Sequence, residues 1–160
     1  YDPSTEYALI EAEGLDYVDF RSAPMAYDWK QIHLYDVDHP STFGSLIISV
    51  RMAEYLAQKY DLPLDTEQKA YYETYFFDDH HVERNGSDLT IELIPADENA
   101  PLSYAWETTF QGQTIATRDF TEDAAFTFPI AESGEYLVRV KVWNPQGDYI
   151  LTAVFTIPSQ

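Results

Sequence analysis

The 160-residue chain contains no cysteine, and it has few basic residues. Without cysteine there is no disulfide, no thiolate nucleophile and no zinc site with sulfur ligands. Only 9 lysines and arginines stand against 28 aspartates and glutamates, so the net charge is −19. The acidic residues are spread along the chain, with 17 in residues 1–86 and 11 in residues 87–160. This charge repels phosphate backbones and anionic lipid heads, so we expect neither nucleic acid nor a bare membrane as a partner.

Long hydrophobic runs are also missing. Aliphatic stretches such as Leu46-Ile47-Ile48 are far too short to span a membrane, and no signal peptide is visible at the start. Hydrophobic residues nevertheless make up 45% of the chain and aromatic residues 16%, which is enough for a packed core. A length of 160 residues suits one ordinary domain or two small ones.

From residue 87 onward, short runs alternate apolar and polar residues, with turn residues between the runs. A period of two predicts β-strands, and their near-regular spacing predicts a sandwich or a barrel. The expected strands are residues 89–94, 102–106, 114–120, 126–128, 135–143 and 149–157. Residues 144–148 carry turn-forming residues and are expected to connect the last two strands as a hairpin.

Before residue 87 the patterns favour helices. Residues 6–13 are expected to form the end of a helix that stops at Gly14, and residues 16–20 alternate like a short strand. An apolar stripe predicts a helix from Ser45 to Tyr60, which ends before Pro63.

A second helix is expected to begin at Asp65, whose carboxylate can cap the first free amides while Gln68 reaches back. The aromatic residues of this helix gather on one side, because positions i and i+4 lie together. These residues are Tyr71, Tyr72, Tyr75 and Phe76. We predict that this aromatic stripe is a docking face between the two halves of the chain and not a ligand platform.

Two motifs in the second half carry a resemblance to a known family. Tyr104-Ala105-Trp106 looks like the central core strand of an immunoglobulin-like sandwich, and Gly134 would make a corner before Tyr136, with Val138 and Val140 pointing inward. This half therefore resembles the bacterial immunoglobulin-like modules of the polycystic-kidney-disease type, with Tyr136 as a tyrosine corner. The Gly-Asp-Gly turn of that family is replaced here by Gln111-Gly112-Gln113. Such modules space or dock catalytic domains, or bind sugar or protein, and the fold does not choose among these roles.

The most specific string in the first half is Asp36-Val37-Asp38-His39-Pro40-Ser41-Thr42-Phe43-Gly44, directly before the 45–60 helix. An imidazole serves as general base for a serine only if another group holds its tautomer and supports its developing charge. A carboxylate three residues earlier, across a turn stiffened by Pro40, can reach the other ring nitrogen. We therefore predict His39 as a catalytic base and Asp36 as the carboxylate that orients it. Gly44 would let the turn pass into the helix.

This string resembles the last conserved block of the SGNH, or GDSL-type, serine hydrolases. In that family Asp-x-x-His-Pro-Ser-x-x-Gly precedes the final helix of a flavodoxin-like domain, and here the resemblance covers residues 5–60. It implies an ester substrate, such as an acyl group on an extracellular polysaccharide. The family's nucleophile stands in a Gly-Asp-Ser motif, and no serine of this chain does. We therefore expect the C-terminal part of a longer hydrolase, inactive alone and completed by an N-terminal remainder or by a second polypeptide.

The same residues also allow a non-catalytic interpretation, in which His39-Pro40 caps a helix and Asp36 and Asp38 are solvated. Two functions therefore stay open: the tail of an SGNH-like esterase, and a non-catalytic cell-surface module that binds or spaces. For both we expect an extracellular or bacterial-surface location and no cofactor or metal.

The expected fold class is α+β overall, with an incomplete α/β segment like the tail of a flavodoxin-like hydrolase, plus an all-β immunoglobulin-like sandwich. The expected units are residues 1–63 for the α/β segment, 64–86 for a linker helix and loop, and 87–160 for the sandwich. A lone strand would leave a sheet edge unpaired, so we expect the first unit to pack on the sandwich or on another copy of the chain.

Three weaker candidates remain. Within Asp78-Asp79-His80-His81, a pair of ligands joined by Glu83 or His33 could hold a metal, although a polar linker is the preferred interpretation because neighbouring side chains alternate faces. Asn85-Gly86-Ser87 matches a glycosylation sequon, with Gly86 expected at the domain boundary. The rings of Tyr149 and Trp143 could stack on sugars, although Trp143 could equally plug the sandwich edge.

Overall fold

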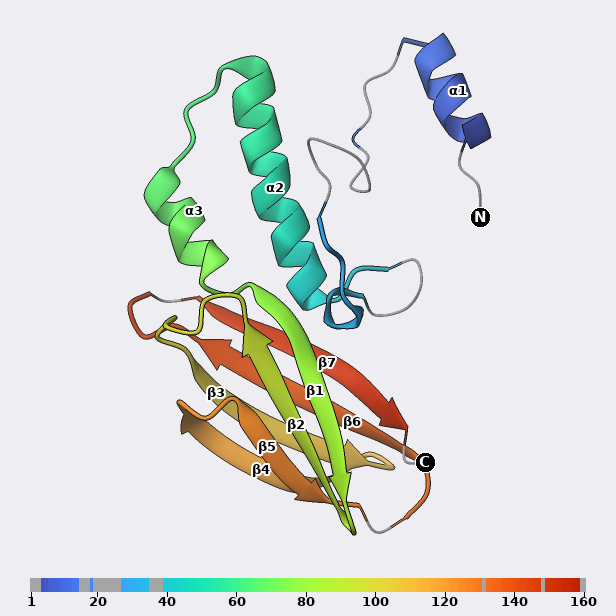
Figure 1. The fold of residues 1–160 in the computed structure, drawn as a ribbon, viewed down its shortest axis with the longest axis vertical. Helices are drawn as coiled ribbons and strands as arrows, with labels where there is room; N and C mark the ends of the chain where they lie inside the picture. Colours follow the sequence, from blue (N-terminus) through green and yellow to red (C-terminus); the bar gives the residue numbers. More distant parts are fainter. Residues whose placement is uncertain are drawn as a thin grey trace.

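The computed structural model describes residues 4–14, 18, 27–34, 39–130, 132–147 and 149–158. Within these residues, helices occupy the first half of the chain and seven strands form a sandwich in the second half. Figure 1 shows that α2 (Thr42–Tyr60) and α3 (Thr66–Glu73) stand on one end of the sandwich. No helix of the described residues is long and apolar enough to cross a membrane.

The first helix, α1 (Ser4–Ala12), is followed by Gly14 at a φ of 65°, a left-handed conformation that favours glycine and ends helices. The helix and its glycine stop were both predicted. The strand expected at residues 16–20 lies outside the described residues except for Val18, which belongs to no helix or strand. A short 3-10 helix, η1 (Gln31–His33), then precedes α2.

Capping side chains set the starts of α2 and α3. The predicted helix at 45–60 begins earlier, at Thr42, because the side chain of Ser41 accepts a hydrogen bond from the backbone N–H of Gly44. At α3 the carboxylate of Asp65 accepts the N–H of Gln68 at 2.9 Å, so the predicted N-cap is confirmed. The last turn of α2 ends at Asp61 in a left-handed conformation, with a φ of 52°.

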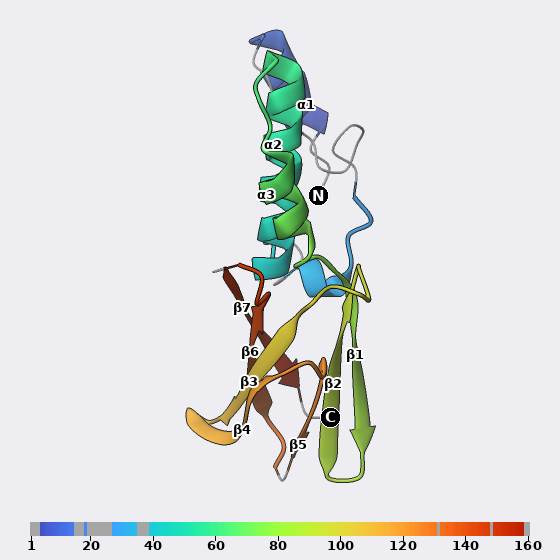
Figure 2. The same cartoon turned by 90° about the vertical axis from the view of Figure 1, so that its left-hand side faces the viewer.

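The sandwich consists of two antiparallel sheets, seen edge-on in Figure 2. One sheet has the order β1-β2-β5 and the other the order β4-β3-β6-β7. The strands are β1 (Phe77–Asn85), β2 (Asp88–Pro95), β3 (Ser103–Phe110), β4 (Gln113–Thr121), β5 (Ala125–Pro129), β6 (Glu135–Trp143) and β7 (Ile150–Pro158). All six strands predicted from the alternating pattern are present.

Strand β1 corrects the interpretation of residues 78–81 as a polar linker. It pairs along its length with β2, from Phe77 opposite Pro95 to Asn85 opposite Asp88. It was missed because β1 is an edge strand whose residues 81–85 are all exposed, so its sequence shows no apolar alternation. Gly86, at a φ of 63°, lies in the two-residue turn of the β1–β2 hairpin and does not mark a domain boundary.

The inner faces of the two sheets form the predicted core. Trp106 is buried and stacks on Phe126 of the facing sheet, with ring centroids 5.5 Å apart. Val138 and Val140 are fully buried, as the inward-pointing pattern predicted. The hydroxyl of Tyr136 donates to the carbonyl oxygen of Glu132 at 2.9 Å, which confirms the tyrosine corner.

Candidate functional site at the junction of helices and sandwich

His39 lies in an exposed bend directly before α2. Asp36, its predicted orienting carboxylate, falls outside the described residues. The Asp36–His39 pair therefore stays a prediction. Pro40, next to His39, forms an isolated antiparallel bridge with Leu34, so residues 34 and 40 lie side by side.

Ser41 joins η1 to the first turn of α2. Its N–H donates to the carbonyl oxygen of His33 at 2.8 Å, and its hydroxyl donates to the carbonyl oxygen of Ile32 at 2.6 Å. The same hydroxyl oxygen accepts the N–H of Gly44 at 3.2 Å. This serine therefore satisfies backbone groups on both elements at once.

Gly44 lies where α2 passes closest to η1. A Cβ atom at this position would lie 2.1 Å from the carbonyl oxygen of His33 and 3.3 Å from the Cβ of Pro40. Its φ is not in the left-handed region, so the requirement for glycine is one of space and not of backbone conformation. The Pro-Ser-x-x-Gly part of the block therefore has a packing reason that is independent of any catalysis.

His33 is a buried residue that sequence reasoning did not single out as structural. Its Nδ1 accepts the backbone N–H of Lys30 at 2.9 Å, so its Nε2 carries the proton and donates to the carbonyl oxygen of Phe77. This bond ties the segment before α2 to the first residue of β1. With both nitrogens engaged, His33 is no free metal ligand, and no group of three potential ligands exists among the described residues. No motif surrounds His33, so the sequence carried no signal for this role.

The predicted aromatic stripe contacts the turn between β6 and β7, although α3 ends at Glu73, so Tyr75 and Phe76 follow the helix and do not lie in it. The buried hydroxyl of Tyr75 donates to the carbonyl oxygen of Tyr149 and accepts the N–H of Asn144 at 2.8 Å. Tyr71 accepts the N–H of Tyr149 at 3.1 Å. The ring of Tyr149 packs edge-on against Tyr72 and Tyr75, with centroids 5.3 and 5.0 Å away. The predicted docking face between the two halves is therefore confirmed.

Burial and the hydrogen bond with Tyr71 both raise the pKa of Tyr75 above its ordinary value of 10.0. The cause is that the phenolate form would lose solvation and one donor role at this contact. The hydroxyl of Tyr75 therefore stays protonated and can keep donating to the carbonyl of Tyr149 at any physiological pH.

The two rings considered for sugar stacking are both partly buried in the protein. Tyr149 packs against α3 as described, and the indole N–H of Trp143 donates to the carbonyl oxygen of Gly147 at 3.2 Å. The indole also meets Phe120 edge-on, with centroids 5.7 Å apart. This agrees with the alternative in which Trp143 plugs the edge of the sandwich.

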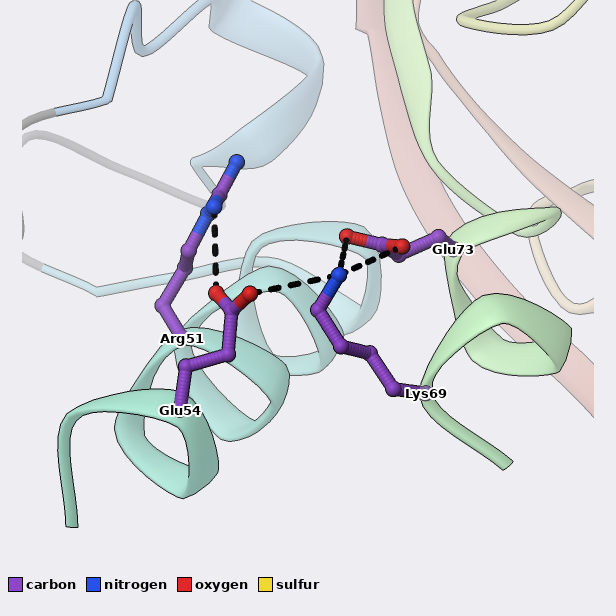
Figure 3. A network of polar contacts seen from close by, with 4 residues as sticks. All are labelled: Arg51, Glu54, Lys69 and Glu73. Carbon is purple, nitrogen blue, oxygen red and sulfur yellow. Dashed lines mark hydrogen bonds and ion pairs between the residues drawn. The ribbon is translucent and has the colours of Figure 1, made fainter. Parts of the chain in front are cut away.

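A polar network joins α2 to α3 (Figure 3). The ammonium of Lys69 lies 2.8 Å from both carboxylate oxygens of Glu73 and 3.2 Å from Glu54. Arg51 reaches the other oxygen of Glu54 at 3.1 Å. The hydrogen bond between Lys69 and Glu73 raises the pKa of Lys69, so its ammonium group stays charged at neutral pH. Of these pairs, Lys69–Glu54 is the one that joins α3 to α2.

Two cavities flank the junction. The first, of about 390 Å³, lies between η1, the start of α2 and the edge of β7, and His80 of β1 also lines it. The second, of about 410 Å³, lies between α2 and α3 and reaches Tyr149. Clefts between packed units are common places for ligands and partners to bind.

Comparison of the sequence with protein-family models finds no match, and comparison with curated proteins finds none. Similar solved structures include domains d3-d4 of the rat CD45 extracellular region, at 18% identity and a TM-score of 0.40 over 50% of this chain and 46% of that chain. This chain thus spans under half of that CD45 chain. The PKD1 domain of the Vibrio cholerae metalloprotease PrtV is 26% identical, with a TM-score of 0.36 over 51% of this chain and 91% of that one.

The PKD1 domain of Vibrio anguillarum Epp is also similar, at 22% identity and a TM-score of 0.37 over 51% of this chain and 88% of that one. The fold itself follows from the coordinates. The sheet orders β1-β2-β5 and β4-β3-β6-β7, together with the tyrosine corner at Tyr136, are those of an immunoglobulin-like module. Residues 77–158 thus form an immunoglobulin-like β-sandwich.

Proposed function

We propose that this chain is a non-catalytic module of an extracellular or cell-surface protein, in which the helices and the sandwich act as one rigid binding or spacing unit. The observation that carries the proposal is the contact of Tyr75 with the β6–β7 turn. One side chain satisfies the N–H of Asn144 and the carbonyl of Tyr149, on the far side of the junction. A junction with shared buried hydrogen bonds keeps its geometry, unlike a flexible linker.

The sequence motif that suggested catalysis also supports this proposal. Ser41 and Gly44 are explained by the packing of η1 on α2, and no serine stands in a Gly-Asp-Ser motif. A general base without a nucleophile does not hydrolyse an ester.

Nuclear magnetic relaxation of backbone amides tests the rigid unit. We expect α2, α3 and both sheets to report one overall tumbling time in the 160-residue chain. Separate tumbling times for helices and sandwich would contradict the proposal. As a control, Tyr72→Phe removes a hydroxyl for which the described structure shows no hydrogen bond, and it should leave the single tumbling time unchanged.

A second candidate function is the C-terminal part of an SGNH-type ester hydrolase, with His39 as general base, Asp36 as its orienting carboxylate and an acylated polysaccharide as substrate. The observation that favours it is the exposed position of His39, immediately before the helix that the family places after this block. An N-terminal remainder with a Gly-Asp-Ser serine would have to complete the site.

Ester hydrolysis by a longer protein that includes such a serine distinguishes the two functions. Under the hydrolase proposal His39→Ala lowers the rate by about 10³-fold or more, as loss of a triad member does. The matched variant Ser45→Ala, on the exposed side of the same helix, should leave the rate unchanged. Equal rates for His39→Ala and the parent protein would rule the hydrolase out.

A further inference from the structure

Strand β7 is the last strand of its sheet in the part of the chain that the structure describes, so one of its edges has no partner strand there. Among the described residues it pairs only with β6, from Ile150 opposite Trp143 to Pro158 opposite Glu135. Beyond that ladder, no backbone hydrogen bond involves residues 153–157 in the described part of the chain. An open edge presents a row of N–H and C=O groups that can pair with another chain.

The first cavity follows this edge. Five consecutive residues of β7, Ala153 to Ile157, line the cavity. Successive side chains of a strand point to opposite faces, so a cavity that touches five in a row runs along the backbone and not over one face. The backbone of β7 is therefore accessible where the cavity lies.

The opposite wall offers apolar surface for side chains. Ile32 and Leu34 from the segment around η1, and Phe43 from α2, line the cavity. His80 of β1 faces it beside Phe155, with ring centroids 5.9 Å apart. An extended segment lying along β7 would place every second side chain against this wall.

We propose that an extended, basic peptide segment of a partner protein adds as a strand to the open edge of β7 in this cavity. Strand addition uses main-chain hydrogen bonds for affinity and pockets for alternate side chains for specificity. The proposal rests on the proposed function, since it names the partner of the binding module.

The charge of the residues that line the first cavity indicates which kind of peptide segment can bind there. Among the lining residues Glu135 is the acid, and no lysine or arginine is present. Burial lowers the pKa of His80, so its ring is neutral at pH 7 and does not offset Glu135. The whole chain carries −19, which attracts a cationic segment and repels an acidic one. The same charge opposes a second copy of this chain at the edge.

A displayed library of random twelve-residue peptides, selected on the full 160-residue chain, tests the proposal. The selected peptides should alternate apolar residues with lysine or arginine. Two matched variants locate the site: Thr156→Lys places a cation in the cavity, and Thr114→Lys places one on β4, the opposite edge of the same sheet. Both threonines are exposed. Thr156→Lys should weaken peptide binding at least about tenfold and Thr114→Lys by less than about twofold.

Hydrogen exchange of backbone amides provides the second measurement. A bound peptide should slow exchange at residues 153–157 and leave β4 unchanged, because only the β7 edge gains ladder hydrogen bonds. The proposal is overturned if no selected peptide distinguishes Thr156→Lys from Thr114→Lys, if the selected peptides are acidic, or if β4 is the strand protected. A dimer in sedimentation that Thr156→Lys abolishes would assign the edge to a second copy. None of these outcomes alters the tumbling test, so a failure here is distinct from a failure of the rigid module.

Discussion

Single residues of the His39 block show how one pattern can have two explanations. Ser41 and Gly44 match the end of a hydrolase motif, yet each has a local structural task between η1 and α2. The serine satisfies backbone groups, and the glycine leaves room for a carbonyl oxygen. His39 lies in an exposed bend before α2, and the catalytic alternative concerns this residue and Asp36.

Replacing Gly44 with alanine tests the packing explanation. In an open helix this change would stabilise by up to about 1 kcal/mol through helix propensity. Here the added Cβ would meet the rigid backbone carbonyl of His33 at 2.1 Å, so we expect a net loss of about 1–3 kcal/mol in the free energy of unfolding. Ser45→Ala, one residue on and exposed, should stay within about 0.5 kcal/mol. Urea unfolding of both variants measures the difference, and a more stable Gly44→Ala would contradict the close contact.

At the scale of elements, the contact between the aromatic stripe and the β6–β7 turn could be predicted from the sequence. Strand β1 could not. Aromatic residues at i and i+4 form a stripe whatever it meets, so docking could be predicted from Tyr71 and Tyr75. Strand β1 has exposed residues on both faces, and only its pairing with β2 makes it a strand. The sandwich therefore begins at Phe77, before the boundary expected at residue 87.

Tyr75→Phe removes the hydroxyl that joins the segment directly after α3 to the β6–β7 turn. The N–H of Asn144 and the carbonyl of Tyr149 then lose a buried partner, so we expect the free energy of unfolding to fall by about 1–3 kcal/mol. Tyr72→Phe changes a residue that is less buried than Tyr75 and should cost less than about 0.5 kcal/mol. Thermal unfolding of the two variants compares the losses, and equal losses would show that the hydroxyl of Tyr75 does not stabilise the junction.

The same hydroxyl predicts how stability changes in alkali. The pKa of Tyr75 is raised in the folded state, mainly by burial, so above pH 10 the unfolded chain releases this proton first. Stability from this group is therefore full below pH 10 and is lost as the pH rises further. Wild type should lose more stability than Tyr75→Phe between pH 9 and pH 11, as urea unfolding at each pH can measure.

On the scale of the whole molecule, acidic repulsion acts against the few ion pairs. The network of Lys69 with Glu54 and Glu73 is local and partly exposed, so it contributes little to the stability of the folded chain. The net charge of −19 is spread over the chain and acts at long range. Repulsion between acidic residues should therefore decide how the stability of the folded chain changes with salt concentration.

Sodium chloride should raise the melting temperature by several degrees between 0.01 and 1 M, as the screening length falls from about 30 to about 3 Å. Replacing the exposed Glu98 and Glu122 with glutamine reduces the net negative charge from −19 to −17 and should reduce this gain. A melting temperature that falls with salt would mean that local ion pairs outweigh repulsion. Scanning calorimetry of the wild type and of the double variant measures the melting temperature at each salt concentration.

Local patterns were enough to predict the strands in residues 89–157, the N-cap of α3 and the aromatic docking face, and the resemblance to a known module predicted the tyrosine corner. Each of these depends on residues close in sequence, through a period of two, a cap at fixed spacing or an i, i+4 stripe. Three features could be learned from the folded chain alone: β1 is a strand, His33 is buried against Phe77, and Gly44 faces a carbonyl oxygen. These depend on partners far along the chain or across an element, which no local pattern encodes. The pairing of Asp36 with His39 stays a prediction from the sequence.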